Sequence, residues 1–250
     1  MTKIKVLIEG YAQKLKNGWV ASSTCCLVES ENKKIITDPG CHRNKLLEAL
    51  KNEKLKIENI DYVFLTHGHT DHALLAGIFK NAKIITFEGF IYKKDLMIDF
   101  KDNILGGDIQ IINTPGHSLE HISLLVNTKN GKYAISGDVF WWVDGEEQFV
   151  DINKKDDAHL KELDMKQLVE SRKRLLKLAD YNKAKKIYSE SEFAQILAEK
   201  WFLICIHATG LGFWTWKTFW KSNLCRHQNI TFTQKVQLAV GCVVRWNGNL

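Results

Sequence analysis

The sequence predicts an α/β fold in which a core of sheets packed on sheets is covered on the outside by helices. Short β-rich runs dominate the first two-thirds of the chain, and most of them end at a Gly, Asp or Asn turn. Helical patterns are interspersed among these runs, and both prolines stand where a strand is expected to end. We therefore expect a layered catalytic domain of mixed secondary structure.

The expected strands are rich in β-branched and aromatic residues. They cover residues 3–9, 20–29, 33–37, 62–66, 83–87, 108–113, 121–127 and 133–136. Helices are expected over residues 44–52 and 160–179, because leucines recur there on one face at a helical spacing.

Length and charge limit the class of protein. With 250 residues, of which 45% are hydrophobic and 26% charged, the chain has the size of one globular domain. Much of the net charge of +6 comes from residues 201–250, where five basic residues and no acidic one leave the main body near neutrality. A basic groove for nucleic acid is therefore not expected in that body. Near the N-terminus the apolar stretch spans only Val6–Ile8, which is too short for a signal peptide and favours a cytoplasmic location.

The cysteines show no spacing typical of a metal knuckle. In a reducing compartment we expect them to be buried thiols rather than disulfides. They are Cys25, Cys26, Cys41, Cys205, Cys225 and Cys242.

The strongest functional signal directly follows the expected strand 62–66. It is the run His67-Gly68-His69-Thr70-Asp71-His72, which places four ligand-type side chains in six positions. Imidazole is a preferred ligand of zinc and carboxylate a usable one. Because alternate residues leaving a strand can converge on one ion while their neighbours reach a second, this run predicts a metal site.

Two other expected strands also end in a candidate ligand. Thr114-Pro115-Gly116-His117 follows one of them, and Ser136-Gly137-Asp138 follows the other. Each glycine is expected to let the backbone approach an ion or a substrate closely. Either motif alone is equally typical of an ordinary turn, but both together with the first run indicate one site.

These motifs, T-H-x-H-x-D-H, T-P-G-H and G-D in this order, resemble the metallo-β-lactamase superfamily over about residues 1–180. The runs 136–140 and 170–174 resemble the branch that contains metallo-β-lactamase domain-containing protein 1 and its prokaryotic relatives. The resemblance implies a four-layer αββα sandwich, with a catalytic domain over residues 1–181. It also implies a hydrolase with two zinc ions that hold a hydroxide at neutral pH.

The resemblance also assigns roles to individual residues. It gives a first zinc ion to His67, His69 and His117, a second to Asp71 and His72, and a bridging position to Asp138. Asp71 is expected in addition to orient the nucleophile and shuttle its proton, which makes it the expected catalytic residue.

Other residues near the motifs are expected in supporting roles. Asp38 resembles a carboxylate that supports the site from below, with a simple turn residue as the alternative. His121 resembles a supporting histidine of glyoxalase-like relatives rather than a ligand. We expect His42 and His159 at the surface or in loops, and Trp141–Trp142 either at the wall of the cleft or packed in the core.

The resemblance stops near Tyr181. Relatives continue with a strand and a Pro-Gly-His-Gly turn that supplies the last histidine of the second zinc site, whereas no Pro-Gly-His occurs downstream here. Five of the eight tryptophans lie beyond residue 200. The atypical segment 182–250 is open to three interpretations: a shifted reading frame, a divergent tail, and a membrane-seeking stretch in 201–220. Sequencing the gene around codon 181 tests the first.

Two classes of function stay open at this point. One is a zinc-dependent hydrolase acting on a phosphodiester in RNA or on a small ester or thioester. The other is a metal-binding protein that lacks activity because its second site is incomplete, and a redox role with iron is a weaker third option. The expected partner is a small-molecule or RNA substrate, without a stable nucleic-acid partner or a membrane, and the resemblance is compatible with a homodimer.

Overall fold

Two sheets form the centre of the computed structural model, which describes residues 1–100, 104–146, 148–156, 163–179 and 203–204. All of these residues lie in one compact unit of the chain. In spatial order the first sheet contains β1 (Lys3–Ile8), β4 (Cys25–Ser30), β5 (Lys33–Thr37), β6 (Tyr62–Phe64), β7 (Lys83–Ile85), β8 (Phe90–Lys93) and β9 (Leu96–Asp99). The second contains β10 (Ile109–Asn113), β11 (Ile122–Thr128), β12 (Gly131–Ile135) and β13 (Leu203–Ile204).

The remaining elements surround these sheets. β2 (Tyr11–Leu15) and β3 (Gly18–Ser22) form a hairpin of their own. The α-helices of the described part are α1 (Arg43–Asn52), the short α2 (Thr70–Ala73) and α3 (Met165–Leu178). Single 3₁₀ turns cover Ile57–Asn59, Ala76–Ile78 and Gly137–Val139.

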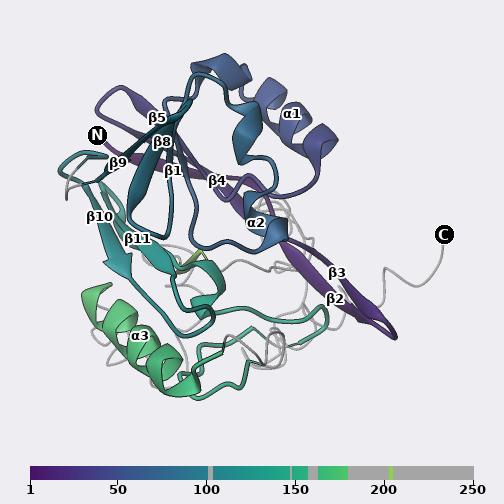
Figure 1. Cartoon of the computed structure of the whole chain (residues 1–250). Coiled ribbons are helices and arrows are strands. Elements are labelled where there is room, and N and C mark those ends of the chain that lie inside the picture. Colours follow the sequence, from purple (N-terminus) through teal and green to yellow (C-terminus); the bar gives the residue numbers. More distant parts are fainter. Residues whose placement is uncertain (101–103, 147, 157–162, 180–202, 205–250) are drawn as a thin grey trace, which may run out of the picture. The chain divides into compact units, whose positions relative to one another are not determined.

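Three apolar clusters separate four layers. One lies between the two sheets, one between the first sheet and α1, and one between the second sheet and α3. Successive strand residues point to opposite faces, so Leu124 and Val126 face the first sheet while Leu125 faces α3. The two helices accordingly lie on opposite outer sides (Figure 1). The expected αββα sandwich is therefore confirmed.

The strand directions bring the motif-bearing loops to one edge. β10 and β12 both pair antiparallel with β11, so their C-terminal ends lie at the same edge of the second sheet. The start of β11 lies at that edge too, and there the N–H of Ile122 donates to the carbonyl of Thr66, just after β6, at 2.8 Å. The loops after β6, β10 and β12 therefore meet where the two sheets touch.

Several boundaries differ from those expected. The stretch 20–29 is two strands, β3 and β4, because Ser23 and Thr24 turn their hydroxyls to the carbonyl of Asp38 and the N–H of Gly10. The helix expected from residue 160 begins at Met165, since the Asp164 carboxylate before it caps the N-terminus. β2, β8 and β9 were not expected, and every residue of β9 is exposed, which removes the alternation that reveals a half-buried strand.

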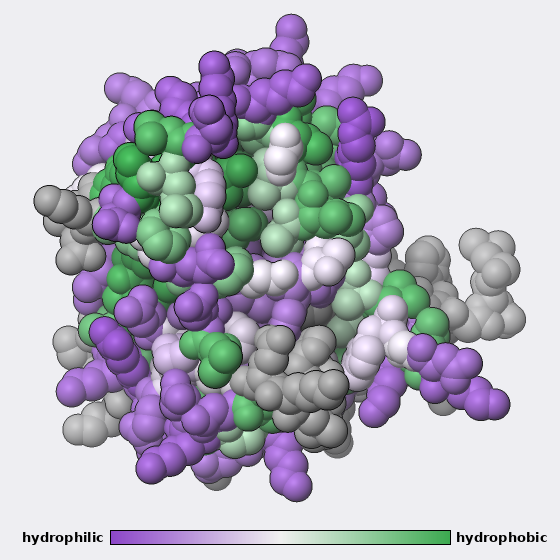
Figure 2. All heavy atoms as spheres, in the orientation of Figure 1, coloured by the Kyte–Doolittle hydropathy of each residue, from purple (hydrophilic) through white to green (hydrophobic). Residues whose placement is uncertain are grey.

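The surface of α3 fits its outer position. All its exposed residues are polar or charged, and the lower left of Figure 2 is correspondingly hydrophilic for the most part. In the described part of the chain no helix combines the length and apolar character needed to cross a membrane.

The atypical segment 182–250 and the boundary near residue 181 lie outside the described residues, apart from β13. β13 pairs in parallel with β12, with Leu203 opposite Ala134. The division into a catalytic domain and a tail stays a prediction.

Candidate metal centre

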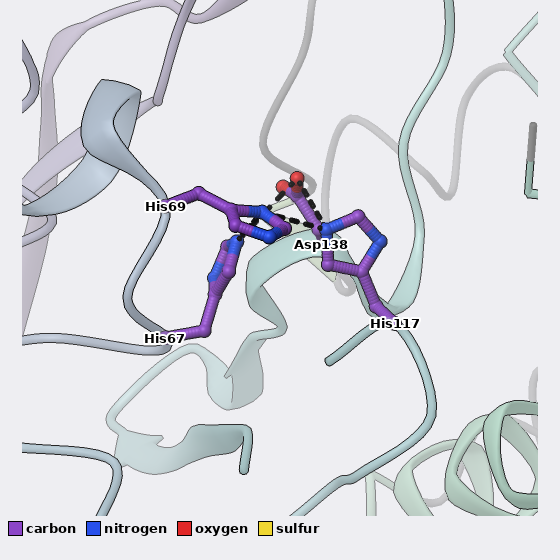
Figure 3. Close-up of side chains that lie close together, drawn as sticks. All are labelled: His67, His69, His117 and Asp138. Carbon is purple, nitrogen blue, oxygen red and sulfur yellow. Dashed lines mark hydrogen bonds and ion pairs between the residues drawn. The ribbon is translucent and has the colours of Figure 1, made fainter. Parts of the chain in front are cut away.

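Four of the six predicted ligands converge at the edge where the loops meet. His67, His69, His117 and Asp138 place one ligand atom each within 4.8 Å of the others, and their rings and carboxylate point toward one another (Figure 3). Nδ1 of His69 lies 2.8 Å from Nε2 of His67 and 3.1 Å from Nε2 of His117. Two nitrogens bound to one tetrahedral zinc at about 2.0–2.1 Å lie about 3.3 Å apart, so these spacings are close to what zinc requires.

The other two predicted ligands lie on the far side of the Asp138 carboxylate. Its Oδ2 is 3.3 Å from Nε2 of His117, whereas its Oδ1 is 3.4 Å from Nε2 of His72. Oδ2 of Asp71 lies 3.7 Å from the same His72 nitrogen. Asp138 thus has one oxygen toward each of two donor groups, and Asp71, with 25% of its side chain exposed, is accessible from solvent.

Asp38 holds the loop that follows β6. It is fully buried, and its two oxygens accept from the N–H and the hydroxyl of Thr66 at 2.8 Å each. Since the Thr66 hydroxyl donates to Asp38, it accepts from Nδ1–H of His67, 3.0 Å away, and the Nε2 lone pair of His67 is left facing the cluster. Asp38 Oδ2 is also 3.2 Å from Nδ1 of His72. Its predicted supporting role is therefore favoured over that of a turn residue.

Asp156 holds His117 in a comparable way. Its Oδ2 lies 2.5 Å from Nδ1 of His117, and both side chains are buried. Asp156 was not predicted from the sequence, because it lies in a polar stretch with no strand, glycine turn or recognisable motif beside it. Proximity to His117 across 39 residues becomes visible only in the fold.

His121 supports the backbone of Asp138. The Ser123 hydroxyl donates to the carbonyl of Ser136, so it must accept from the Thr114 hydroxyl, which in turn accepts from Nδ1–H of His121. Nε2 of His121 is then unprotonated and accepts the N–H of Asp138 at 3.2 Å. His121 is a neutral imidazole behind the site, as its expected supporting role requires.

Burial and neighbouring charges set the pKa values of the histidines. Burial lowers the pKa of His67 and of His121 well below the usual value, and the nearby histidines add to the effect. Burial acts in the same direction on His72, but the carboxylates of Asp138 and Asp38 outweigh it and raise the pKa of His72 well above its usual value. Burial lowers the pKa of His117 too, but the carboxylates of Asp138 and Asp156 outweigh it and raise that pKa above its usual value. The metal-free cluster therefore combines two histidines with a lowered pKa, His67 and His121, with two whose raised pKa favours the protonated form, His72 and His117.

The two glycines before His117 and Asp138 pack closely against the protein itself. Gly116 has a φ of +132°, and a Cβ there would lie 2.2 Å from the backbone nitrogen of Leu168 in α3. Gly137 has a φ of +56°, and its Cβ would lie 2.4 Å from Nε2 of His121. Both positions therefore require glycine for conformation and packing, and the close approach to an ion or substrate stays a prediction.

The remaining candidates lie away from the ligand cluster. His42 is exposed at the start of α1, with Nε2 2.5 Å from the Tyr11 hydroxyl, and His159 lies outside the described residues. Trp142 is part of the core beneath α3, and Trp141 packs edge-to-face on Trp19 of the hairpin. Trp142 therefore packs in the core, whereas Trp141 packs against the hairpin, and its place in the wall of a cleft stays a prediction.

The chain is similar to a known protein family in sequence and to solved structures in fold. Residues 18–87 match the model of the Metallo-beta-lactamase superfamily, a stretch that includes Asp38 and the run from His67 to His72. The solved N-acyl homoserine lactone hydrolase with its product at the catalytic metal centre shares the fold, with a TM-score of 0.52 and 17% identity over 81% of this chain and 91% of that one. Residues 18–87 thus resemble the metallo-beta-lactamase superfamily, and the described part of the chain holds a His/Asp cluster that could bind metal.

The chain is also similar to several curated proteins. Metallo-beta-lactamase domain-containing protein 1 of Xenopus laevis is 28% identical over 146 residues, which are 55% of this chain and 63% of the relative. The N-acyl homoserine lactonase of Bacillus cereus is 28% identical over 145 residues, 42% of this chain and 58% of the relative. Hydroxyacylglutathione hydrolase 1 of Vibrio vulnificus is 30% identical over 102 residues, 38% of this chain and 40% of the relative. The chain spans less than two thirds of the length of each.

Proposed function

We propose that the chain is a zinc-dependent hydrolase that cleaves a small carboxylic ester or thioester. The position of Asp138 carries this proposal, because one carboxylate with an oxygen toward each of two donor groups suits two ions held about 3.5–4 Å apart. Three imidazoles and carboxylates are also the donor set that zinc prefers in catalytic sites.

The tautomers of the histidines favour metal binding over a simple hydrogen-bonded cluster. Thr66 accepts from Nδ1–H of His67, and Asp156 faces Nδ1 of His117, so both residues direct an Nε2 lone pair to the same point. A ligating histidine in a protein is usually oriented in this manner through its other nitrogen. His69 faces that point with Nδ1 instead.

The proposed chemistry assigns one task to each group of residues. Bound zinc would supply a water whose pKa is near 7 and a Lewis acid for the attacked carbonyl. Asp71, at the accessible side of the cluster, would orient that water and take up its proton. Asp38, Asp156 and His121 would keep the ligands in place.

The class of substrate follows from charge and from the relatives. Basic and acidic residues nearly balance in residues 1–200, whereas binding of a phosphate backbone relies on an excess of lysine and arginine. Two of the relatives are named for the hydrolysis of a lactone and of a hydroxyacylglutathione, which are an ester and a thioester. These observations favour a small acyl substrate over RNA.

A second candidate is a metal-binding protein without turnover. In the part of the chain that the structure describes, only Asp71, His72 and the shared Asp138 make up the second donor group. The sequence lacks a Pro-Gly-His turn downstream, and the later histidines, His207 and His227, lie outside the described residues.

Metal content and turnover distinguish the two candidates. Plasma emission on the purified protein would be combined with hydrolysis of an acyl lactone, a thioester, bis-p-nitrophenyl phosphate and a short RNA. About two zinc ions per chain with acyl turnover that His67→Ala abolishes and His42→Ala leaves intact would support the hydrolase. One ion or none without turnover would support the inactive form, and cleavage of RNA alone would overturn the acyl substrate.

A further inference from the structure

We infer that Asp156 is a positioning residue of the metal centre, whose carboxylate fixes the His117 imidazole with Nε2 directed at the ion. The inference rests on the proposed metal site. Nothing in the motifs marks Asp156, and the proposed reaction does not need it to touch a substrate.

The Asp156 carboxylate determines which nitrogen of the His117 imidazole carries the proton. A neutral imidazole has one N–H and one lone pair, and a carboxylate at Nδ1 selects the form with the proton on that nitrogen. Asp156 Oδ2 lies 2.5 Å from Nδ1 of His117, which leaves Nε2 as the lone-pair atom. That atom lies 3.1 Å from Nδ1 of His69 and 3.3 Å from Oδ2 of Asp138, at the centre of the cluster.

Asp156 is buried. Its side chain has no exposed surface, and an ionised carboxylate in such a place is strongly unfavourable unless opposite charge or hydrogen bonds compensate. Its contact is with a predicted ligand, and the charge of the buried Arg172 lies close enough to be felt between the two groups. The hydrogen bond to His117 and the charge of Arg172 both help to make this buried placement favourable.

Hydrogen bonds from a buried arginine anchor the segment that carries Asp156. Arg172 of α3 donates from Nη1 to the carbonyls of Ile152 and Lys154 at 3.1 and 2.6 Å, just before Asp156. Its Nε donates to the carbonyl of Val139, next to Asp138, at 2.8 Å. One buried cation thus fixes the segment that supports His117 relative to the turn that carries Asp138.

Ser171, the neighbour of Arg172, extends this anchoring to the loop of His117. Its hydroxyl donates to the carbonyl of Pro115 at 2.7 Å, two residues before His117. The run 170–174, which resembled one branch of the superfamily, therefore has a physical role as the anchor of these loops.

The test compares Asp156→Asn with the wild-type chain and with Asp151→Asn. Asp151 is a matched control because it lies in the same segment and also interacts with the charge of Arg172, whereas its carboxylate accepts from the N–H of Asn153 rather than from a predicted ligand. Zinc affinity would be measured by competition with a chelator, and ligand geometry by the visible spectrum of the cobalt-substituted protein. We expect Asp156→Asn to weaken zinc binding about 10–100-fold and to alter the cobalt spectrum, with no change in Asp151→Asn.

The outcomes separate this inference from the proposed function. Wild-type affinity and spectrum in a folded Asp156→Asn chain would overturn the role of Asp156 and leave the metal site standing, whereas a wild-type chain that binds no zinc would overturn the metal site itself. Asp156→Glu is the second variant, in case the first does not fold. It keeps the charge but displaces the carboxylate, so zinc affinity equal to that of the wild type would also contradict the inference.

Discussion

The two halves of the candidate centre are held in different ways. The first half, the loop His67–His72 after β6, relies on Asp38 and on backbone bonds from residues 23 and 40 to α2. The second half, His117 and Asp138, relies on side chains that come much later in the sequence. Asp156 follows His117 by 39 residues, and Arg172 follows Val139, the neighbour of Asp138, by 33. Ligands grouped in one loop can share one nearby support, whereas ligands from separate strands each need a support of their own.

The largest effect is expected at Asp138, where the halves meet. Asp138→Asn removes the charge and leaves an amide oxygen that is a weaker ligand and a poor bridge. We expect zinc content to fall by about one ion per chain and kcat/KM on the acyl substrate to fall about 10²–10³-fold. Asp144→Asn, an exposed residue of the same loop, is the control for both measurements. Retention of two ions by Asp138→Asn would show that the halves do not share this carboxylate.

Arg172→Met should have the next largest effect, on stability. The change removes a buried charged donor from three carbonyls, and we expect the metal-free protein to lose about 4 kcal/mol in its free energy of unfolding by urea. Lys173→Met, the neighbouring exposed position, breaks only a surface pair with Glu170 and should change stability by less than about 1 kcal/mol. Equal losses in the free energy of unfolding of the two variants would show that Arg172 does not anchor the second half.

Asp38→Ala tests the first half. It leaves the N–H and hydroxyl of Thr66 without their acceptor, and we expect a loss of about 2 kcal/mol in the same urea experiment. The matched change is Asp61→Ala, whose exposed carboxylate accepts from the N–H of Lys34. If the free energy of unfolding falls no further in Asp38→Ala than in Asp61→Ala, the loop after β6 does not depend on Asp38 for its stability.

The smallest effect is expected at Asp164, the N-cap of α3. Bonds from the N–H and side chain of Gln167 lower the pKa of Asp164, so the folded form favours the carboxylate. The stability that the Asp164 carboxylate contributes is present above the pKa of about 3.9 that it has in the unfolded chain. This stability is lost as the pH falls through the lower pKa of the folded state. The difference between wild type and Asp164→Ala in unfolding midpoint should therefore be constant near neutrality and shrink in acid. A difference that grows in acid would contradict this sign.

Much of the fold could be predicted because most strands have apolar residues on both faces. β11 alternates between two cores, and β6 supplies Val63 to one core and Phe64 to the other, which is the pattern of a buried central strand. The hairpin β2–β3 and the edge strand β9 gave no such signal because they are largely exposed. Their pairing depends on turns and on neighbours distant in sequence.

The candidate ligands could be read from the sequence, but most of their supports could not. His67–His72 stands out because four ligand types follow one strand, while Asp38 had a partial signal in its turn. Asp156 and Arg172 contact the centre through the fold alone, across a loop and a helix that face the second sheet. A local sequence pattern cannot reveal such contacts, because the two residues are far apart in the sequence and no regular spacing links them.

The adjacent thiols of Cys25 and Cys26 in β4 point into different apolar cores, one beneath α1 and the other between the sheets. Both are free and buried, and burial raises the pKa of the Cys26 thiol to about 12, so neither reacts readily with an alkylating reagent in the native state. The two adjacent thiols can therefore serve as internal probes of the two cores. The order in which they become labelled during unfolding would reveal which of the two layers opens first.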